Sequence, residues 1–354
     1  MAGGRRRAEW LLLFGSLLFL LLLGGMLELA VRLFSDVDLL GNSRNLFVAN
    51  AYRTSNGNAP NVEGSSFGQV VYTDGFGFRV PKGGVAGDAG KAEAILILGD
   101  SVGFGPAVEE PETFAGLLRA RFPDKRIYNS SVIGYATRDY RNVVESFVPE
   151  HPEVKSVVLV FCLNDISESS SRNIDRYLKA DEQKAEPRRP PEQNLTEMLR
   201  SFTFLSDAND FLRSRSKLYL FLRHRLLKTQ LRDWKSALRL YSDERTADVE
   251  HAARDIAAIA AQLEQRRIPL AVVLSPFEYQ LRSPDDPDAQ VPQQKLGELL
   301  RELGVGYIDP RPAFLAEGLR STDYFLAYDS MHFSARGHRV IADRIVEFLE
   351  RGSG

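Results

Sequence analysis

The stretch Ile95-Leu96-Ile97-Leu98-Gly99-Asp100-Ser101-Val102-Gly103-Phe104-Gly105 decides the fold. Its four leading apolar residues predict a strand that is buried on both faces, as strands of parallel sheets are. The strand ends in Gly-Asp-Ser, and ligands of open α/β sheets bind beyond the carboxyl ends of the strands. We therefore expect Ser101 where a reactive group would lie. Because Gly, Asp and Ser also form ordinary turns, this stretch alone leaves a purely structural turn open.

Strands and helices alternate along the rest of the chain. Apolar runs predict further strands at residues 126–128, 156–161, 270–274 and 305–308. Apolar residues at helical spacing predict helices at residues 113–122, 138–147, 247–266, 293–303 and 335–349. Strands that alternate with helices indicate a parallel sheet covered on both faces. The predicted fold class is therefore α/β.

Composition and charge fit a globular protein and exclude several classes of protein. The 354 residues are 44% hydrophobic and 26% charged, as is usual for globular domains. The net charge of −2 gives no basic field, so no nucleic-acid partner is expected. The single cysteine, Cys162, excludes an intramolecular disulfide and leaves no cysteine cluster for zinc. We expect neither a metal nor another cofactor.

The N-terminus has the pattern of a membrane anchor. Residues 1–9 include Arg5, Arg6 and Arg7, and residues 10–27 form an uncharged run about as long as a bilayer core is thick. Arginines on the near side predict a cytoplasmic N-terminus and an extracytoplasmic remainder, either periplasmic or extracellular. A cleaved signal peptide is the alternative, but the run is long for one and no clear cleavage site follows it. The sequence favours a single-pass anchor that is retained.

Two segments lie outside the alternating pattern. Residues 28–92 are predicted to form a juxtamembrane linker and a small N-terminal extension, so that the α/β domain, residues 93–354, starts near Ala92. Residues 167–246 interrupt this domain with a helical, Leu- and Arg-rich insertion. Because βα connections are usually only a few residues long, we expect the insertion to cap a site, to bind a partner or to rest on the membrane. A solvated basic helical pair is the alternative.

The candidate base is His332, in the stretch Tyr328-Asp329-Ser330-Met331-His332-Phe333-Ser334 after the last predicted strand. Asp329 precedes it by three residues, a spacing at which a carboxylate can meet the imidazole and fix its tautomer. Because both follow a strand, we expect them at the same sheet edge as Ser101. A serine hydroxyl needs such a base to become a nucleophile. His338, further along the chain, is expected on the helix surface.

Acyl transfer also needs hydrogen-bond donors for the developing oxyanion. Gly134 and Asn164 each follow a predicted strand, so both are expected at the edge that holds Ser101. The backbone N–H groups of Ser101 and Gly134 and the side-chain amide of Asn164 can supply three donors. Glycine at position 134 allows close backbone approach. Asp165, next to Asn164, is interpreted as a residue that starts a helix.

Together these residues resemble a known family. Gly99-Asp100-Ser101, Gly134, Asn164-Asp165 and Asp329-x-x-His332 are similar, in their order, to the four blocks of the SGNH (GDSL-type) hydrolases. The resemblance spans about residues 93–350, interrupted by the insertion. It implies a flavodoxin-like three-layer α/β/α fold and serine esterase or acyltransferase chemistry without a metal. It also implies that Ser101 is the nucleophile, that Asp329 and His332 complete the triad, and that Gly134 and Asn164 complete the oxyanion hole.

The chain departs from the family pattern at two positions. Cys162 stands where the third block usually has glycine, and Ser131 where the second block often has one. Neither residue supplies a group to the chemistry, but both are expected to alter the shape of the pocket. The turn Gly75-Phe76-Gly77-Phe78-Arg79 resembles membrane-anchored members of the family. Some members of that kind act on envelope polysaccharides as acetyl esterases or O-acetyltransferases.

Three functions follow as hypotheses. The first is an extracytoplasmic serine esterase that removes small acyl groups, above all O-acetyl groups, from an envelope carbohydrate. The second keeps the triad but works as an O-acyltransferase with a membrane acyltransferase or acyl-donor protein as its partner. The third is a catalytically silent scaffold on the same fold. The presence of a suitable residue at every triad and oxyanion position argues against this third hypothesis. The expected partners are an acylated small molecule or polysaccharide and the membrane.

Overall fold

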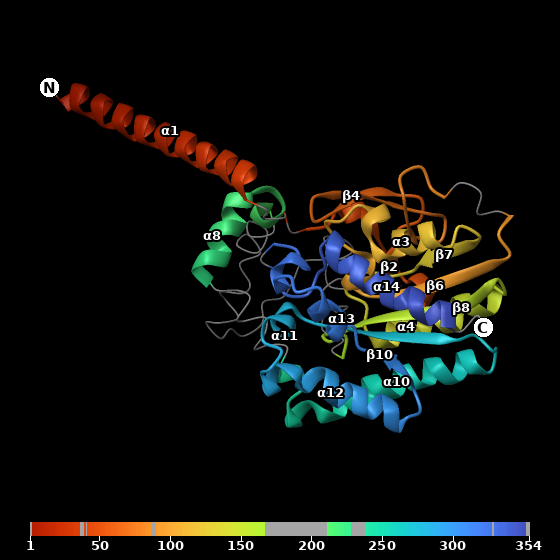
Figure 1. The fold of residues 1–354 in the computed structure, drawn as a ribbon. Coiled ribbons are helices and arrows are strands. Elements are labelled where there is room, and N and C mark those ends of the chain that lie inside the picture. Colours follow the sequence, from red (N-terminus) through yellow and green to blue (C-terminus); the bar gives the residue numbers. More distant parts are fainter. Residues whose placement is uncertain are drawn as a thin grey trace, which may run out of the picture.

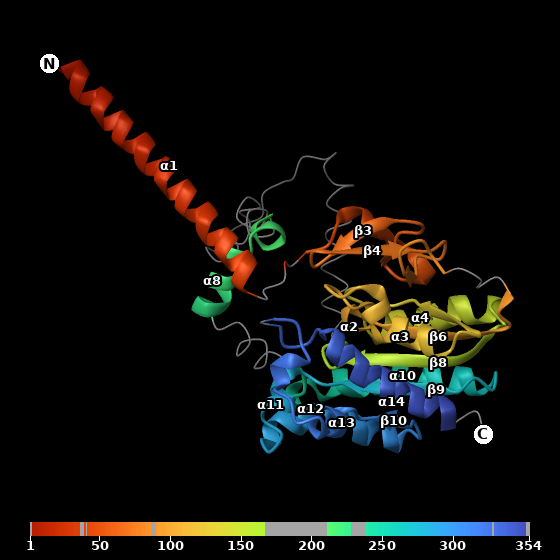
Figure 2. The ribbon, with the colours of Figure 1, turned by 45° about the horizontal axis from the view of Figure 1, so that its top comes forward.

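Five parallel strands form the centre of the molecule. The strands are β6 (Glu93–Gly99), β7 (Lys125–Asn129), β8 (Val154–Cys162), β9 (Leu270–Ser275) and β10 (Tyr307–Ile308). Their order, β10-β9-β8-β6-β7, is the 2-1-3-4-5 order of flavodoxin-like sheets. The predicted α/β class and flavodoxin-like sheet are thereby confirmed. The computed structural model, shown in Figures 1 and 2, describes residues 2–35, 39, 41–85, 90–166, 211–227, 238–327 and 329–351.

The strand β8 runs through the middle of this sheet. Its residues 157–162 are each at most 1% exposed, since β6 and β9 flank it and helices cover both of its faces. A continuous Val/Leu/Phe run suits a strand that has no solvent face. Cys162 ends this run with its thiol in the core, so the cysteine in the third block packs as a small apolar residue.

Helices cover both faces of the sheet (Figure 1). On one face, α3 (Phe114–Arg121) and α14 (Ala335–Arg351) pack against each other. On the other face lie α4 (Thr137–Phe147), α10 (Thr246–Glu264) and α12 (Pro287–Glu302). The helix α12 begins earlier than its predicted start at residue 293. Asp286 caps it by accepting a hydrogen bond from the backbone N–H of Asp288, and Pro287 occupies the first turn, where proline is tolerated.

Short elements connect these layers. The α-helical ones are α2 (Ser101–Phe104), α11 (Glu278–Arg282) and α13 (Arg311–Ala316). Single 3₁₀ turns lie at Arg44–Leu46, Ala51–Arg53, Glu110–Glu112, Val148–Glu150, Asp243–Arg245 and Ser321–Asp323. The helix α2 directly follows β6, so the residue after Gly99-Asp100 opens a helix at the carboxyl edge of the sheet.

The N-terminal extension enlarges the same sheet. The strands β3 (Glu63–Ser66), β4 (Gln69–Thr73) and β5 (Arg79–Val80) form an antiparallel ribbon. β5 pairs with β7 through Arg79 and Asn129, which makes an eight-stranded sheet. The sheet therefore begins earlier in the chain than the expected start near Ala92. Two further strands, β1 (Phe47–Ala49) and β2 (Asn56–Asn58), pair with each other in a separate sheet.

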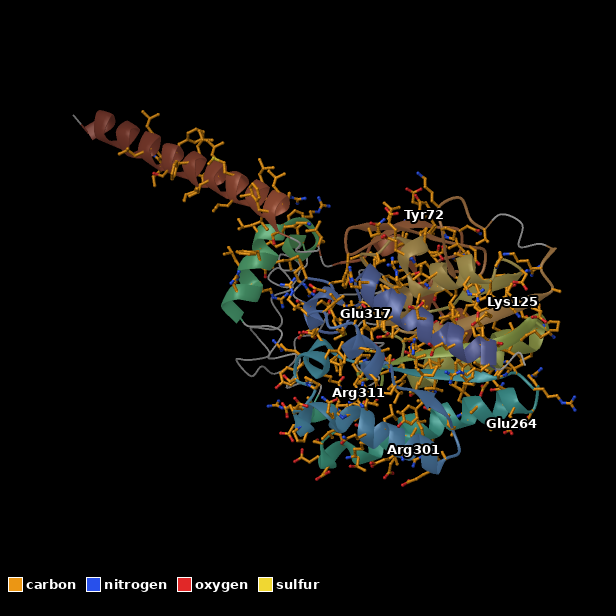
Figure 3. All side chains as sticks on the ribbon, in the orientation of Figure 1. Tyr72, Lys125, Glu264, Arg301, Arg311 and Glu317 are labelled. Atoms are coloured by element: carbon orange, nitrogen blue, oxygen red, sulfur yellow. The ribbon has the colours of Figure 1, made fainter. Side chains whose placement is uncertain are left out.

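One long helix projects from the molecule. The helix α1 (Ala2–Phe34) extends away from the domain in Figures 1 and 2, and Figure 3 shows its side chains standing clear of the remaining structure. Its segment Trp10–Phe34 has a mean hydropathy of 2.4 and no buried part. It is the one helix in the described part of the chain that is long and apolar enough to cross a membrane. A signal sequence has the same length and composition.

The insertion at residues 167–246 is described only in part. Residues 167–210 and 228–237 lie outside the described residues, and with them lies about half of the Leu- and Arg-rich stretch from Phe202 to Leu240 that is expected to be helical. The described part contains no strand, as predicted, and includes the helix α8 (Lys217–Leu227). This helix lies against the end of α1 rather than against the sheet (Figure 1).

Candidate active site

The turn that carries Ser101 is built by its neighbours. Asp100 caps α2 because its Oδ1 accepts the N–H of Val102 at 2.7 Å, which fixes Ser101 as the first helical residue. Gly103 lies so close to the next loop that an added Cβ would stand 2.4 Å from Oγ of Ser131. The glycine therefore lets the turn pack on the loop that follows β7.

Three side chains meet at this turn in one line of hydrogen bonds. Nε2 of His332 lies 2.8 Å from Oγ of Ser101, and Nδ1 of His332 lies 2.7 Å from Oδ2 of Asp329. Asp329 also closes its own turn, since its Oδ1 accepts the N–H groups of Met331 and His332 at 2.8 and 2.9 Å. The sequence spacing of three residues thus places carboxylate, imidazole and hydroxyl within mutual reach.

The charges of the site favour an imidazole that is easily protonated. Burial disfavours the imidazolium, but the charge and hydrogen bond of Asp329 outweigh it, so the pKa of His332 lies above its ordinary value. Burial would raise the pKa of Asp329, yet His332 and the backbone N–H groups hold that pKa below its ordinary value. The pair therefore stabilises a positive charge on the ring that faces Ser101.

Gly134 and Asn164 follow the two strands that flank β6. The loop of Gly134 is tied to the end of β6, because the N–H of Val132 donates to the oxygen of Gly99 at 3.1 Å. Gly134 has a φ of +88°, which favours glycine. Asn164 follows the end of β8, where Val160 lies in register with Gly99. Both residues thus belong to the sheet edge that carries Ser101, as the sequence predicts.

Asp165, which the sequence predicts at a helix start, lies in the turn that follows β8. It is 1% exposed, and its Oδ2 accepts hydrogen bonds from the Tyr140 hydroxyl at 2.6 Å and from the N–H of Cys162 at 2.9 Å. Burial and the charge of Asp100 raise its pKa well above the ordinary value for aspartate. Asp165 thus closes the turn after β8 behind the nucleophile. The course of the chain beyond residue 166 lies outside the described residues.

The comparisons with known proteins agree with this geometry. A family model described as "GDSL-like Lipase/Acylhydrolase family" matches residues 97–340. The chain belongs to this family. It is therefore a serine hydrolase of the GDSL type, an enzyme that acts on esters. No curated protein matches the sequence.

Solved structures similar to this GDSL-type hydrolase are distant. An acetylxylan esterase from Geobacillus stearothermophilus is 14% identical, with a TM-score of 0.41, and the match covers 73% of this chain and 95% of that one. A member of the lipolytic protein G-D-S-L family from Veillonella parvula is 13% identical with the same TM-score, and the match covers 73% and 100%. An α/β hydrolase from the metagenome of Lake Arreo is 15% identical, again at 0.41, with coverages of 73% and 94%.

His338 of the hydrolase is not on the surface, contrary to the expectation. It is fully buried, and its Nδ1 accepts the N–H of Phe114 at 3.3 Å. Burial, assisted by the charge of Arg79, lowers its pKa to about 3, so the ring stays neutral. The reason is that α14 packs on α3 from its first turn onward. His338 is a packing residue of the core, whereas His332 is the histidine in hydrogen-bond contact with Ser101.

Phe67 of the hydrolase is a site residue that the sequence did not predict. It lies in the two-residue turn between β3 and β4, since Ser66 pairs with Gln69, and its ring meets that of His332 edge to face at 5.3 Å between centroids. Its φ of +49° is strained for an aromatic residue at a position where Asn is usual. In the sequence, Phe67-Gly68 indicates at most the turn of a hairpin. Only the structure shows that this hairpin lies next to His332.

Arg79 is the second residue that sequence reasoning missed. Its guanidinium is fully buried and donates hydrogen bonds to the main-chain oxygens of Phe104, Gly105 and Val108. Burial lowers its pKa to about 10, which leaves it charged at neutral pH. Arg79 thus holds the end of the helix that Ser101 opens.

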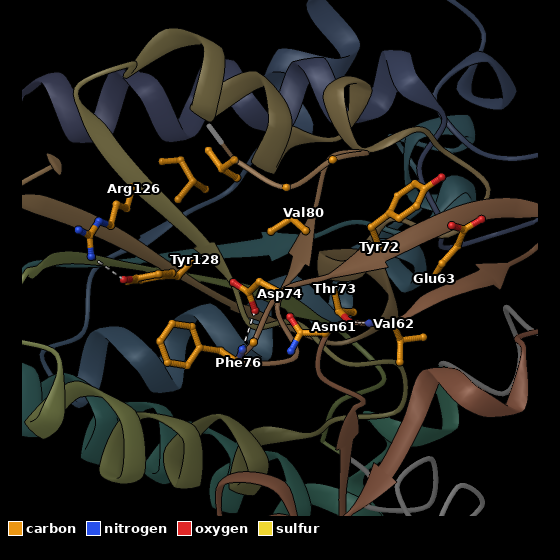
Figure 4. A pocket seen from close by; sticks show the side chains of 15 residues that line it. Asn61, Val62, Glu63, Tyr72, Thr73, Asp74, Phe76, Val80, Arg126 and Tyr128 are labelled. Atoms are coloured by element: carbon orange, nitrogen blue, oxygen red, sulfur yellow. Dashed lines mark hydrogen bonds between the residues drawn. The ribbon is translucent and has the colours of Figure 1, made fainter. Parts of the chain in front are cut away.

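A cavity of about 630 Å³ lies away from the triad (Figure 4). Residues of the N-terminal extension and of β7 line it, and no triad residue does. Two of its polar groups are engaged by the fold: Asp74 accepts the N–H groups of Phe76 and Phe78, and the Tyr128 hydroxyl donates to Glu153. Among the described residues, no three His, Cys, Asp or Glu side chains are grouped to hold a metal ion.

Proposed function

We propose that this hydrolase cleaves small acyl esters, above all O-acetyl groups of an envelope carbohydrate, with Ser101 as nucleophile, His332 as base and Asp329 as its partner. The unbroken line of hydrogen bonds from Asp329 through His332 to Ser101 supports these roles most directly. The likeness of the glycine-rich turn at residues 75–79 to membrane-anchored family members supports a carbohydrate of the envelope as the substrate.

The reaction proceeds in two acyl transfers. Nε2 of His332 takes the proton of Ser101 while Oγ attacks the ester carbonyl and forms a tetrahedral intermediate. The N–H groups of Ser101 and Gly134 and the amide of Asn164 bind its oxyanion. The imidazolium returns the proton to the departing sugar oxygen, which leaves an acyl-serine. His332 then deprotonates water, which attacks the acyl-serine, so that the carboxylic acid is released and Ser101 is restored.

The orientation of the imidazole follows from Asp329. With Nδ1–H held by the carboxylate, Nε2 carries the lone pair that faces Ser101. The same carboxylate stabilises the imidazolium that forms in each transfer, which is consistent with the raised pKa of His332. Among the described residues the ring nitrogens bond to Asp329 and Ser101, whereas Asp100 accepts the N–H of Val102 and, at 3.2 Å, the Ser101 hydroxyl. Asp165 accepts the Tyr140 hydroxyl and the N–H of Cys162. We therefore assign the role of partner of the base to Asp329.

The position of Phe67 is consistent with a substrate that carries a small acyl group. Its ring lies against His332, on a hairpin that is anchored because the N–H of Phe67 donates to the oxygen of Gly41 at 2.8 Å. An aromatic side chain at this place narrows the space next to the base. We therefore assign acetyl-sized esters as the preferred substrates.

We assign this chemistry to the outside of the cytoplasm. Arg5, Arg6 and Arg7 precede the apolar helix, an order that favours a cytoplasmic N-terminus and export of the domain. We divide the chain into residues 1–9 in the cytoplasm, an anchor that starts at Trp10, and an enzyme domain. This domain includes the ribbon of residues 63–80 in addition to residues 93–354.

The proposal is tested by labelling and product release with the full-length protein in detergent. A fluorophosphonate probe should label Ser101, and acetylated model sugars should release acetate. Ser101→Ala should keep the fold and lose several orders of magnitude in kcat, since removal of a triad member typically does so. Ser283→Ala, outside the site, serves as the matched control. Wild-type rates from the Ser101→Ala protein would refute the assignment, and transfer to an added alcohol in place of acetate release would identify an acyltransferase.

A further inference from the structure

The end of the anchor helix is joined to α8 by a defined set of contacts. The carboxylate of Glu28 accepts hydrogen bonds from Oγ of Ser216 at 2.7 Å and from the N–H groups of Lys217 and Leu218 at 3.0 Å. It therefore caps α8, where an acidic group is favourable. One turn further along α1, Arg32 donates to the oxygen of Arg215 at 2.7 Å. The contacts fix α8 beside the point where the apolar run of α1 ends (Figures 1 and 2).

This position lies at the level of lipid headgroups if α1 spans the bilayer. The uncharged run from Trp10 to Leu27 has 18 residues. At 1.5 Å per residue it covers roughly 27 Å, close to the roughly 30 Å of a bilayer core. Glu28 is the first charged residue after the run, so it and the helix that it caps lie at the boundary between hydrocarbon and headgroups.

The segment at this level has the composition of a membrane-surface helix. Residues 211–227 contain five basic residues and no acidic one, within a chain whose net charge is −2. Apolar side chains are interspersed among them, and three are exposed: Phe211 at 56%, Leu212 at 38% and Leu222 at 45%. Basic residues mixed with exposed Phe and Leu are typical of helices that lie on anionic membranes.

The helix α8 has one side buried in the protein and an opposite side that carries Leu and Arg. Leu220 is fully buried, and Leu218, Leu222 and Arg225, spaced three and four residues apart, share the opposite face. The guanidinium of Arg225 lies over the ring of Phe221 at 5.4 Å, which keeps the cation next to apolar surface. The face of α8 opposite Leu220 thus carries leucine side chains together with a cation, which suits contact with both acyl chains and phosphate groups.

We infer that residues 211–227 rest on the membrane and bind anionic phospholipid headgroups beside the exit of α1. This inference rests on the proposed membrane anchor. The five basic residues of this segment, which has no acidic residue of its own, favour an anionic lipid surface over a second copy of this weakly acidic chain. Bound in this way, α8 holds the enzyme domain against the bilayer through two contacts, the anchor and the surface helix.

The experiment uses the full chain in lipid nanodiscs with an environment-sensitive fluorophore. Leu222→Cys carries the probe, and Leu303→Cys, equally exposed but at the end of α12, is the control. The native Cys162 is buried and is left in place. In discs that contain phosphatidylglycerol, the Leu222→Cys probe should shift to the blue and be quenched by spin-labelled lipid, whereas the Leu303→Cys probe should not.

Charge removal provides the second arm. Arg225→Gln should lower the equilibrium constant for binding of residues 211–227 to the anionic lipid surface about fivefold, since one basic residue near such a surface contributes about 1 kcal/mol. Arg301→Gln on α12 should leave it unchanged, and high salt should act in the same direction as Arg225→Gln.

Three outcomes overturn the inference in distinguishable ways. If the chain enters the discs but the Leu222→Cys probe keeps a solvent-like emission with anionic lipid, α8 does not bind the surface. If the probe is blue-shifted without lipid quenching, protein rather than lipid covers α8. If the chain does not enter the discs at all, the anchor itself is refuted.

Discussion

Ser101 and His332 are separated by 231 residues in the sequence, yet their side chains are in hydrogen-bond contact. The contact arises because each residue follows a strand of one parallel sheet, so both chain segments turn at the same edge. Asp329 needs no such long-range help, since a single turn brings it to His332. The Ser101–His332 contact thus depends on the topology of the sheet, whereas the Asp329–His332 contact is local.

The pH dependence of the enzyme follows from the raised pKa of His332. The base must be neutral to act, so kcat/KM should fall on acidification with a single-proton limb whose midpoint lies above 6.5, the ordinary value for histidine. Asp329→Asn removes the charge that raises this pKa, while burial remains and lowers it. The variant should therefore show a limb at lower pH and a rate lower by about 10⁴, because the imidazole also loses its tautomer control.

The pH profile is measured with an acetyl ester on the wild type and on Asp329→Asn. Asp323→Asn is the matched control, because Asp323 pairs with Arg320 at the surface. A limb that stays at the wild-type pH in Asp329→Asn would contradict the assignment of Asp329 as partner of the base.

Phe67 is predicted to set the acyl length that the enzyme accepts. Phe67→Ala should raise the ratio of kcat/KM for butyryl over acetyl esters by about tenfold or more, since one or two methylene groups in an apolar site are worth about that much. Val70→Ala, an exposed position on the same hairpin, should leave the ratio unchanged. An unchanged ratio in Phe67→Ala would place the acyl group away from this ring.

At the scale of elements, the ribbon β3–β5 contacts the candidate site at two points. It delivers Phe67 to one side of His332 and Arg79 to the end of the nucleophile helix. Arg79→Met should lower the free energy of unfolding by roughly 2–4 kcal/mol, because three buried main-chain oxygens lose their donor. It should also slow labelling of Ser101 by the fluorophosphonate probe.

Thermal unfolding and the rate of labelling check this prediction together. Arg121→Met is the control, since that arginine lies at the surface beside Glu350. A protein that unfolds early but is labelled at the normal rate while folded would show that Arg79 stabilises the domain without positioning Ser101.

The sequence predicted the parallel strands, the longer helices and the meeting of Ser101, His332 and Asp329, because each leaves a local trace such as an apolar run or a short spacing. It did not predict β5, which has only two residues and gains its place by pairing with Asn129. The contacts of Phe67 with His332 and of Arg79 with the end of α2 join residues far apart in the sequence, so no local pattern could assign them. The burial of His338 was missed for a similar reason, since α3 covers a helix face that the spacing alone leaves open.

For the whole molecule, the apolar helix α1 predicts the location of the enzyme. A reporter fused after Gly354 should be active outside the cytoplasm, and the full-length chain should stay in the membrane fraction. Replacement of Arg5, Arg6 and Arg7 by glutamate should reduce correct insertion, because the orientation depends on these charges. Release of a shortened soluble enzyme would instead identify α1 as a cleaved signal peptide.

The pairing of β5 with β7 also affects the order in which the parts of the site can form during synthesis. A chain made from its N-terminus presents Phe67 and Arg79 early, but the ribbon that carries them joins the sheet only when residue 129 has followed. His332 follows Ser101 by 231 residues, together with the helix that packs on α3. The growing chain therefore carries Ser101 without its proposed base over this whole interval. We expect hydrolytic activity only after His332 has been added.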